Sequence, residues 1–410
     1  MEHQAGVYNN EGPLLLARPE LRRAWTLLQA IDEWVLDRQM ELTAIPAPPF
    51  GEGPRGERMA MLFAEVGLQD IETDEVGNVL GRIPFPEQAP PGDSPGEHPL
   101  IVSAHLDTVF PPGTPVTPRR EGDRIQAPGI SDDGRGLAAL LALARVLSES
   151  PLPLPHPLLF VATVGEEGPG DLRGVRHLLV NAEDAPHPRG FISLDGVGMD
   201  RIITQGVGST RLRITLTGSG GHSWTDFGRP NPIHTLGKIV AEAQALVLPH
   251  NPRTTLTIAR WGGGTSINAI PQDAWVEVDI RSEAGPELVS LEAEFVRICR
   301  KTLDAEPFRE ASPEGLSLEL SEIGRRPAGA TLPSSPLVKA AVKATQLLGE
   351  DPILMASSTD SNLPMSLDIP SITMGAGGTG GGIHTTDEWY ENRKGPVGIF
   401  RTLLTLLFLG

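Results

Sequence analysis

Two adjacent glutamates, Glu166 and Glu167, directly follow an apolar run and are the first residues in this sequence to suggest chemistry. The run 158–164 (LLFVATV) is typical of a strand buried inside a parallel sheet, and Gly165 ends it. Two like charges at the end of a buried strand repel each other and lose hydration together, which costs free energy unless a partner compensates them. The alternative is that both are solvated charges of a surface loop.

Other imidazoles and carboxylates stand at comparable positions, after an apolar strand or just before a helix. They are His105 and Asp107 in SAHLDTV, Asp132 and Asp133 in GISDDGRG, Asp195 in SLDGVG and His384 in GGGIHTTDEW. The carboxyl ends of parallel strands meet at one edge of a sheet, where ligands bind. Imidazole and carboxylate groups together suit Zn²⁺ or a similar divalent ion. Their joint occurrence therefore favours a metal site.

Each of these residues also has an ordinary structural explanation. Asp132 and Asp133 could cap the helix that follows them, Asp195 could be a turn residue, and a single histidine at a strand end could be structural. His105 and Asp107 are two residues apart, so on a strand they point to one side. Asp107 could then accept the second ring N–H of His105 and fix its tautomer.

The order of apolar segments predicts the elements that position these residues. Strands are expected over 98–106, 157–164 and 190–194, and helices over 136–147 and 173–180. Such alternation predicts an α/β domain with a mostly parallel sheet flanked by helices. After residue 206 the order becomes strand 210–218, helix 232–246, strands 253–260 and 274–281, helix 286–303 and strand 316–323. This β-α-β-β-α-β order is that of a ferredoxin-like α+β sandwich.

We therefore expect two domains: a discontinuous catalytic domain, 1–206 and 324–410, and an inserted domain, 207–323. The net charge of −18, from 52 acidic and 34 basic residues among 410, argues against nucleic acid and anionic membranes as partners. The single cysteine, Cys299, excludes an internal disulfide and a cysteine-based zinc cluster. The apolar segment 398–410 is too short to span a membrane and contains Arg401, so we expect a helix docked on a core. We expect a cytoplasmic protein without a targeting segment.

Taken together, these motifs resemble the co-catalytic two-zinc aminoacylase/carboxypeptidase family of metallopeptidases. That family includes peptidase T, glutamate carboxypeptidase, acetylornithine deacetylase and succinyl-diaminopimelate desuccinylase. The matching stretches are SAHLDTV, GISDDGRG, GEEG, SLDG, GSGGHS, INAIPQDAWVEVDIR and GGIHTTDEW, in the family's order over most of the chain. GEEGPGDLRG and SSTDSN look closest to peptidase T-like di- and tripeptidases.

The resemblance implies a role for each residue of the expected metal site. Glu166 would be the general base, and Asp132 would bridge two divalent ions, with Zn²⁺ as the first choice and Mn²⁺ or Co²⁺ as alternatives. His105 and Asp195 would complete one ion's site, and Glu167 and His384 the other's. The cations would then offset the repulsion between the two glutamates. The resemblance also implies a cis peptide between Asp132 and Asp133.

In the inserted domain, His222 matches the family's lid histidine, which stabilises the oxyanion and often comes from the partner subunit. Asn268 and Arg281 match positions that hold the substrate carboxylate, which a guanidinium fork suits. The alternatives without a functional role are that His222 is a turn residue and that Arg281 is a surface charge at the end of a strand. Gly377 lies in GAGGTG (375–380), where no apolar helix follows as a dinucleotide site would need. We read this segment as a backbone loop that carries His384 and contacts the substrate.

The sequence thus predicts metal-dependent hydrolysis of a peptide or N-acyl amide bond next to a free carboxylate. A di- or tripeptidase is favoured. The alternatives are an N-acyl-amino-acid deacylase (aminoacylase) and a catalytically silent binding protein on the same scaffold. We also expect a homodimer formed through the inserted domain, with 209–218 as an exposed edge strand available for pairing.

Overall fold

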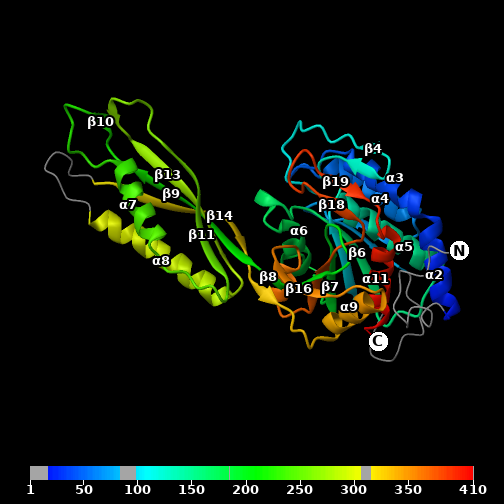
Figure 1. Cartoon of the computed structure of the whole chain (residues 1–410). Helices are drawn as coiled ribbons and strands as arrows, with labels where there is room; N and C mark the ends of the chain where they lie inside the picture. The colour runs from blue at the N-terminus through cyan, green and yellow to red at the C-terminus, as the bar shows by residue number, and fades with distance from the viewer. Residues whose placement is uncertain (1–16, 84–97, 184, 306–314, 410) are drawn as a thin grey trace. The chain divides into compact units, whose positions relative to one another are not determined.

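The computed structural model describes residues 17–83, 98–183, 185–305 and 315–409. The chain forms two compact units, one of Met1–Gly206 with Ala330–Gly410 and one of Val207–Gly329 (Figure 1). The second unit ends six residues later than the expected boundary at 323. Its last strand does not stop at Ile323 but continues to Arg326.

The first unit is built around a mixed sheet whose middle is parallel. The sheet order is β1-β2-β6-β3-β7-β17-β8-β15, and β16 pairs with β8. The strands are β1 Gln69–Thr73, β2 Val79–Arg82, β3 Leu100–His105, β6 Leu158–Thr163, β7 Gly190–Leu194, β8 Arg201–Gly206, β15 Gly329–Ala330, β16 Ile353–Ser357 and β17 Ser371–Met374. Strands β6, β3, β7 and β17 run parallel to one another, whereas β1–β2, β2–β6 and β17–β8 are antiparallel pairs. The expected α/β class with a mostly parallel central sheet is confirmed.

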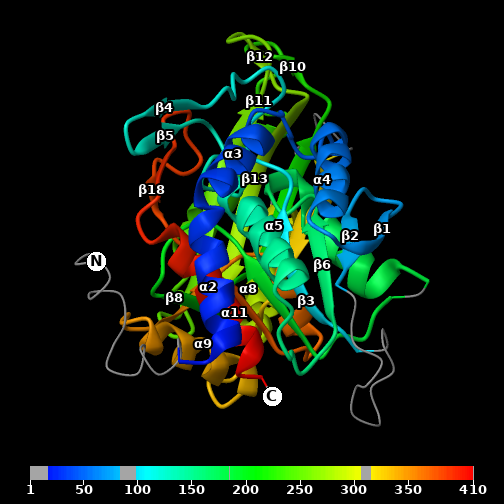
Figure 2. The same ribbon diagram turned by 90° about the vertical axis from the view of Figure 1, so that its right-hand side faces the viewer.

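Helices cover both faces of this sheet because its central strands are apolar on both sides. They are α2 Pro19–Ala30, α3 Asp32–Thr43, α4 Gly53–Glu65, α5 Gly134–Glu149, η1 Gly168–Gly170, α6 Arg173–Arg176, the π-helical turn η2 His177–Asn181, α9 Pro336–Leu347, α10 Asn362–Ser366 and α11 Gly395–Leu407. Figure 2 shows α2, α3, α5 and α11 packed together over one face. On β3, Val102 packs into the core on the α5 side, and its neighbour Ile101 into the core that contains residues of α6 and α10.

A small four-stranded sheet in the first unit joins segments that are far apart in the sequence. It consists of β18 Thr379–Gly381, β19 Trp389–Glu391, β5 Arg124–Gln126 and β4 Arg119–Glu121, in that order and all antiparallel. The pairing of β19 with β5 brings the hairpin that carries His384 to the chain that leads into Asp132. These short strands were not expected from the sequence.

The C-terminal helix α11 packs into the core of the first unit despite its arginine. Arg401 is fully buried, and its guanidinium donates to the backbone carbonyls of Met199 and Gly375. Burial lowers the pKa of Arg401 to about 10, so the side chain stays charged at neutral pH. In the part of the chain that the structure describes, no helix has both the length and the apolar character needed to cross a bilayer.

The second unit has the predicted β-α-β-β-α-β order. Its elements are β9 Gly208–Thr217, α7 Pro232–Gln244, β11 Thr254–Gly263, β13 Asp273–Ser282, α8 Gly285–Asp304 and β14 Ser317–Arg326, with a short pair of β10 Gly221–His222 and β12 Ala269–Ile270. The sheet order is β11-β13-β9-β14, all antiparallel. The expectation that 209–218 forms an edge strand is wrong, because β9 has a hydrogen-bonded neighbour on each side and the edges are β11 and β14.

Candidate metal centre

His105 is the last residue of β3, and its ring is buried at the carboxyl end of the central sheet. Its Nδ1 lies 3.0 Å from the backbone carbonyl oxygen of Asp107, and its Nε2 lies 3.0 Å from Oδ1 of Asp132. A proton on Nδ1 that is donated to this carbonyl leaves the Nε2 lone pair free for an ion.

The carboxylate of Asp107 has a different role from the one expected. Its nearest approach to the ring of His105 is 3.7 Å, between Oδ1 and Nδ1. Instead, Oδ1 accepts the backbone N–H of Glu166 at 2.9 Å, and Oδ2 accepts that of Glu167 at 2.8 Å. The tautomer of His105 is therefore fixed by the backbone of Asp107, and the side chain of Asp107 holds the two glutamates in place.

Asp132 and Asp133 take different roles although they are adjacent. The peptide bond between them is cis, as the resemblance implied. Asp133 is fully buried and caps α5, since its side chain accepts the backbone N–H of Gly136 at 3.0 Å. It also accepts the backbone N–H of His105 at 3.0 Å and of Gly196 at 3.2 Å. The capping explanation thus holds for Asp133.

Asp132 places one carboxylate oxygen toward each of two imidazoles. Its Oδ1 lies 3.0 Å from Nε2 of His105, and its Oδ2 lies 3.2 Å from Nε2 of His384. Burial alone would raise the pKa of Asp132, but the two imidazoles outweigh burial and hold this pKa well below its usual range. One carboxylate shared between two imidazoles in this way has the geometry of a bridging ligand.

Glu167, His384 and Asp195 complete the cluster. Nε2 of His384 lies 2.9 Å from Oε1 of Glu167. The carboxylates of Asp132 and Glu167 raise the pKa of His384 to about 10. At Asp195, burial and repulsion by the Asp132 carboxylate raise the pKa to about 7. Both shifts show that negative charge is in excess here and that a proton or a cation must balance it.

The residues present fit two divalent ions. Ligand atoms can be chosen within 4.8 Å of one another in three groups: His105–Glu166–Glu167, His105–Asp133–Asp195 and Asp132–Glu167–His384. The separations of 2.9–3.2 Å between imidazole and carboxylate atoms are close to the edge of about 3.3 Å of a tetrahedral site with bonds of about 2.0 Å. Nitrogen and carboxylate donors of this kind suit Zn²⁺, Mn²⁺ or Co²⁺.

In the second unit, the structure brings His222 and Asn268 together at one end of the sheet. His222 pairs with Ala269 in the short ladder β10–β12, and the backbone N–H of Ser223 donates to the Asn268 carbonyl at 3.0 Å. Both residues are exposed. Nδ1 of His222 accepts the backbone N–H of Trp224 at 3.2 Å. In the neutral ring Nε2 then carries the proton and can donate it to a negatively charged oxygen.

Arg281 lies elsewhere in the second unit. It stands near the far end of β13, eight positions after Asp273, which at about 3.3 Å per residue amounts to roughly 26 Å. Its Nε donates to Asp279 Oδ2 at 2.7 Å, and the side chain is 42% exposed. Asp273 begins β13 on the side of the β10–β12 pair, so Arg281 is separated from His222 and Asn268.

Gly377 is buried in the first unit. Its φ of +79° favours glycine, and a Cβ there would lie 2.8 Å from the carbonyl oxygen of Gly395. Its backbone N–H donates to the carbonyl of Gly198 at 3.2 Å. These contacts explain the glycine by packing, and a role in substrate binding stays a prediction.

Two carboxylates near the metal cluster were not singled out by their chemistry in the sequence. The sequence places Asp133 beside Asp132 without separating their roles, and it gives Glu388 no metal-site or strand-end pattern. Glu388 is fully buried and accepts hydrogen bonds from the backbone of the loop that carries Asp132. Its place four residues after His384 was the only signal in the sequence that could have drawn attention to it.

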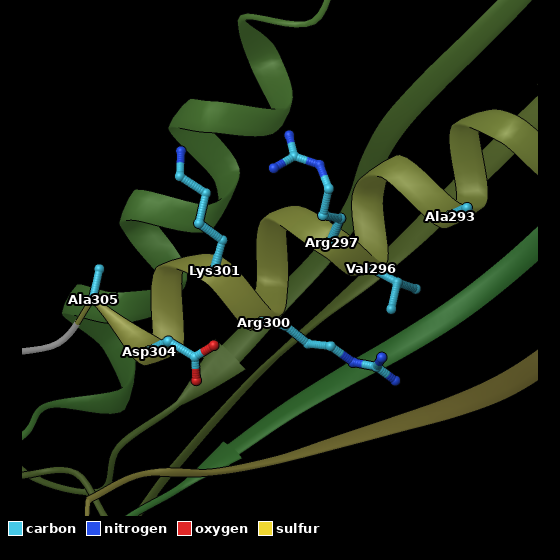
Figure 3. A pocket seen from close by; sticks show the side chains of 7 residues that line it. All are labelled: Ala293, Val296, Arg297, Arg300, Lys301, Asp304 and Ala305. Atoms are coloured by element: carbon cyan, nitrogen blue, oxygen red, sulfur yellow. The ribbon is translucent and has the colours of Figure 1, made fainter.

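A hollow of about 750 Å³ lies on α8 of the second unit (Figure 3). None of the candidate site residues described above lines it. The side chains that line it include Arg297, Arg300 and Lys301. Arg297 is paired with Glu294 on the same helix, and Lys301 with Glu242 on α7. The hollow therefore offers charged surface groups but no candidate for catalysis.

A known peptidase shares sequence with part of this chain. The chain is 25% identical to the cytosol non-specific dipeptidase of Escherichia coli over 287 residues, which cover 64% of this chain and 56% of that protein. The match thus spans just over half of that relative's length.

Solved structures share the fold of most of the chain at low identity. Aminopeptidase PepT from Bacillus cereus superposes with a TM-score of 0.72 at 20% identity, covering 92% of this chain and 98% of that one. A dinuclear metal-binding peptidase of the M20 family from Bacillus subtilis gives 0.65 at 16% identity, covering 93% and 98%. The sequence profile of peptidase family M20/M25/M40 matches residues 101–405. With most of its length inside that match, the chain belongs to peptidase family M20/M25/M40.

Proposed function

We propose that this protein is a dinuclear metallopeptidase that hydrolyses di- or tripeptides at the peptide bond next to a free carboxylate. The observation that carries the proposal is the position of Asp132 between His105 and His384, with one oxygen toward each ring. The names of two similar proteins, a dipeptidase and an aminopeptidase, support small peptides as the substrate class.

In this proposal Asp132 would be shared by the two ions, His105 and Asp195 would hold one of them, and Glu167 and His384 would hold the other. Two divalent ions held there would make a bound water more acidic and would polarise the scissile carbonyl. Zn²⁺ is the first choice, and Mn²⁺ and Co²⁺ are alternatives with the same ligand preferences.

Glu166 is proposed to be the general base. It is buried beside Glu167, and its backbone is fixed by Asp107. The carboxylate removes a proton from the attacking water and then gives that proton to the leaving amine, so that one water is consumed for each C–N bond broken. The carboxylate returns to its starting state after each turnover.

The second unit is proposed to supply the groups that bind substrate. The Nε2–H of His222 would stabilise the oxyanion, and Asn268 and Arg281 would bind the substrate carboxylate. His222 and Arg281 lie far apart in the second unit, so one small peptide cannot contact both from the same copy of that unit. This separation supports a homodimer in which His222 and Asn268 serve the partner's active site and Arg281 serves its own. The name of the cytosol dipeptidase supports a cytoplasmic location.

The central test is the variant Glu166→Gln, with Glu57→Gln on the exposed side of α4 as its matched control. Loss of a general base lowers turnover by about 10²–10⁴-fold, and the variant should keep both ions because Glu166 has no assigned ligand role. Activity would be measured on dipeptides, tripeptides and N-acyl amino acids with Zn²⁺, Mn²⁺ or Co²⁺. Turnover of Glu166→Gln within tenfold of wild type would remove it as the base. No hydrolysis by the wild type in any combination would favour the silent binding protein, and hydrolysis of N-acyl amino acids alone would favour the deacylase.

The action of His222 across a dimer can be tested by mixing two inactive variants, Glu166→Gln and His222→Ala. After subunit exchange, one site of a mixed dimer would combine an intact Glu166 with an intact His222, and activity should reappear. If labelled subunits exchange and activity stays at the level of the separate variants, His222 does not act across the dimer.

A further inference from the structure

Glu388 makes a concentrated set of contacts to the loop that carries the bridging carboxylate. Its side chain has no exposed surface. Oε2 accepts the backbone N–H of Gly129 at 2.7 Å, and Oε1 accepts those of Ser131 at 2.7 Å and Asp132 at 2.9 Å. One carboxylate thus satisfies three backbone donors within four consecutive residues of this loop.

Further hydrogen bonds continue the pairing of β5 with β19 past the last paired residues of the two strands. Strands β5 and β19 are paired up to Gln126 opposite Trp389. The backbone N–H of Ala127 then donates to the Glu388 carbonyl at 3.0 Å, and the hydroxyl of Ser131 donates to the Trp389 carbonyl at 2.9 Å. The loop before Asp132 is therefore joined to the hairpin on which His384 is carried, only four residues before Glu388.

From this geometry we propose that Glu388 is a positioning residue that aims the carboxylate of Asp132 at both ions and fixes its distance from His384. The inference rests on the proposed role of Asp132 as the bridging ligand. A bridging carboxylate must place two oxygens at two ions at once, so a shift of its backbone changes both bonds. Glu388 holds that backbone at the N–H of Asp132 itself.

The chemistry of the three donors requires a carboxylate at this position. A glutamate has two acceptor oxygens, whereas a glutamine has one oxygen and one NH₂ group. In either orientation of a glutamine, the NH₂ group faces at least one backbone N–H of the loop, and that buried donor loses its partner. Glu388→Gln therefore changes almost no volume but removes the means of holding the loop.

The test compares Glu388→Gln with two reference variants. Glu391→Gln lies on the same hairpin, where Glu391 pairs with Arg124 at 2.8 Å and contacts no backbone of the loop. Asp132→Ala removes the bridging carboxylate itself. Each metal-free protein would be titrated with Zn²⁺ in competition with a chromogenic chelator, and the visible spectrum of each Co²⁺-saturated protein would be recorded. Circular dichroism would establish that each variant is folded.

We expect Glu388→Gln to bind Zn²⁺ about 10–100-fold more weakly, the usual effect of losing a group that orients a ligand. Its Co²⁺ spectrum should differ from wild type even at saturation, because the geometry of the bridge is altered. A role in stability alone would restore the wild-type spectrum once the ions are bound. We expect kcat to fall with little change in KM, since Glu388 does not contact substrate. Glu391→Gln should match wild type in all these measurements.

The outcomes separate this inference from the proposed function. If Asp132→Ala loses the ions while Glu388→Gln keeps wild-type affinity and spectrum, the role of Glu388 is wrong and the metal assignment stands. If Asp132→Ala still binds two ions, the bridging assignment fails and the inference fails with it. If Glu388→Gln does not fold, Glu388→Asp replaces it, since a shorter carboxylate cannot reach all three donors. An intermediate affinity in that variant supports the proposal, and a wild-type affinity overturns it.

Discussion

Asp107→Asn tests whether the carboxylate of Asp107 holds the two glutamates, as its contacts indicate, rather than the ring of His105. Asp107 has no exposed surface, and its two oxygens accept the backbone N–H groups of Glu166 and Glu167. Asparagine has the same shape but only one side-chain oxygen. Its NH₂ group would face one of the two N–H donors, and that donor would be left buried without a partner.

The expected cost can be worked out from these two bonds. A hydrogen bond to a charged group contributes about 1.5–3 kcal/mol, and an unsatisfied buried donor costs about 1–3 kcal/mol. In Asp107→Asn, one hydrogen bond is lost and its N–H donor is left unpaired. The other hydrogen bond is then made to a neutral oxygen and no longer to a charged one. Counting the lost bond and its orphaned donor as one effect, we expect the free energy of unfolding to fall by about 2–4 kcal/mol. We expect kcat to fall about 10–100-fold, because a displacement of the Glu166 backbone by about 1 Å misplaces the base.

Urea denaturation of the metal-free protein measures the free energy of unfolding, and steady-state kinetics measures kcat and KM. Asp123→Asn, in the exposed turn between β4 and β5, is the matched control and should stay within about 0.5 kcal/mol of wild type. The backbone carbonyl that accepts from His105 is unchanged in Asp107→Asn. Unaltered stability together with a large loss of metal affinity would refute this reasoning and restore the role first expected for Asp107 as the partner of the imidazole.

Three further outcomes follow from packing and burial. Gly136→Ala should lower the free energy of unfolding by about 3 kcal/mol or more. The reason is that a Cβ there would lie 2.2 Å from Asp133 Oδ1 and 2.4 Å from the Leu194 carbonyl oxygen. A denaturation midpoint equal to that of the wild type would contradict this prediction. Gly237→Ala, inside α7 with nothing within 4 Å of its Cβ, should raise the free energy of unfolding by about 0.5–1 kcal/mol, and a loss would show that the helix needs the glycine. Burial raises the pKa of the Cys299 thiol to about 12, so iodoacetamide at pH 8 should label Cys299 only after denaturant is added; rapid labelling of the native protein, seen by mass spectrometry, would contradict this.

The proposed ligand residues could be grouped from the sequence because of the fold class. His105 ends β3, and Asp195 follows β7 directly, so each residue stands where an apolar run stops. In a sheet with a parallel centre these positions converge, and no knowledge of distances was needed to group them. The order of strands and helices in the second unit was visible for a similar reason, since its elements are long enough to show their periodicity.

The order of strands within the second unit's sheet could not be read in the same way. Strand β9 alternates buried and partly buried residues, as expected for a strand with one face on a core. A central strand and an edge strand of such a sheet share this pattern, because the pattern reports the covered face and not the hydrogen-bonded neighbours. The sequence pattern therefore cannot distinguish β9, a central strand, from an edge strand.

The alternation rule does not predict the role of Asp107, because the strand ends before that residue. Strand β3 stops at His105, and the chain then leaves the extended conformation. Residues two apart share a side only while the strand continues. The small sheet could not be predicted, because β5 and β19 have three residues each, which is too few to show a period. These two strands also pair with each other although more than 260 residues separate them in the sequence.

The acidic residues around the metal cluster can be sorted by what surrounds their oxygens. Asp107, Asp133 and Glu388 each accept two or three backbone N–H groups, which neutralise part of their charge and fix the loops they hold. Asp132 and Glu167 instead face imidazole nitrogens. A carboxylate satisfied by amides has little left to offer a cation, whereas one that faces imidazoles is placed to share an ion with them. Both kinds of carboxylate are the same letters in the sequence, and only the backbone around each one separates the proposed ligands from the residues that hold the loops.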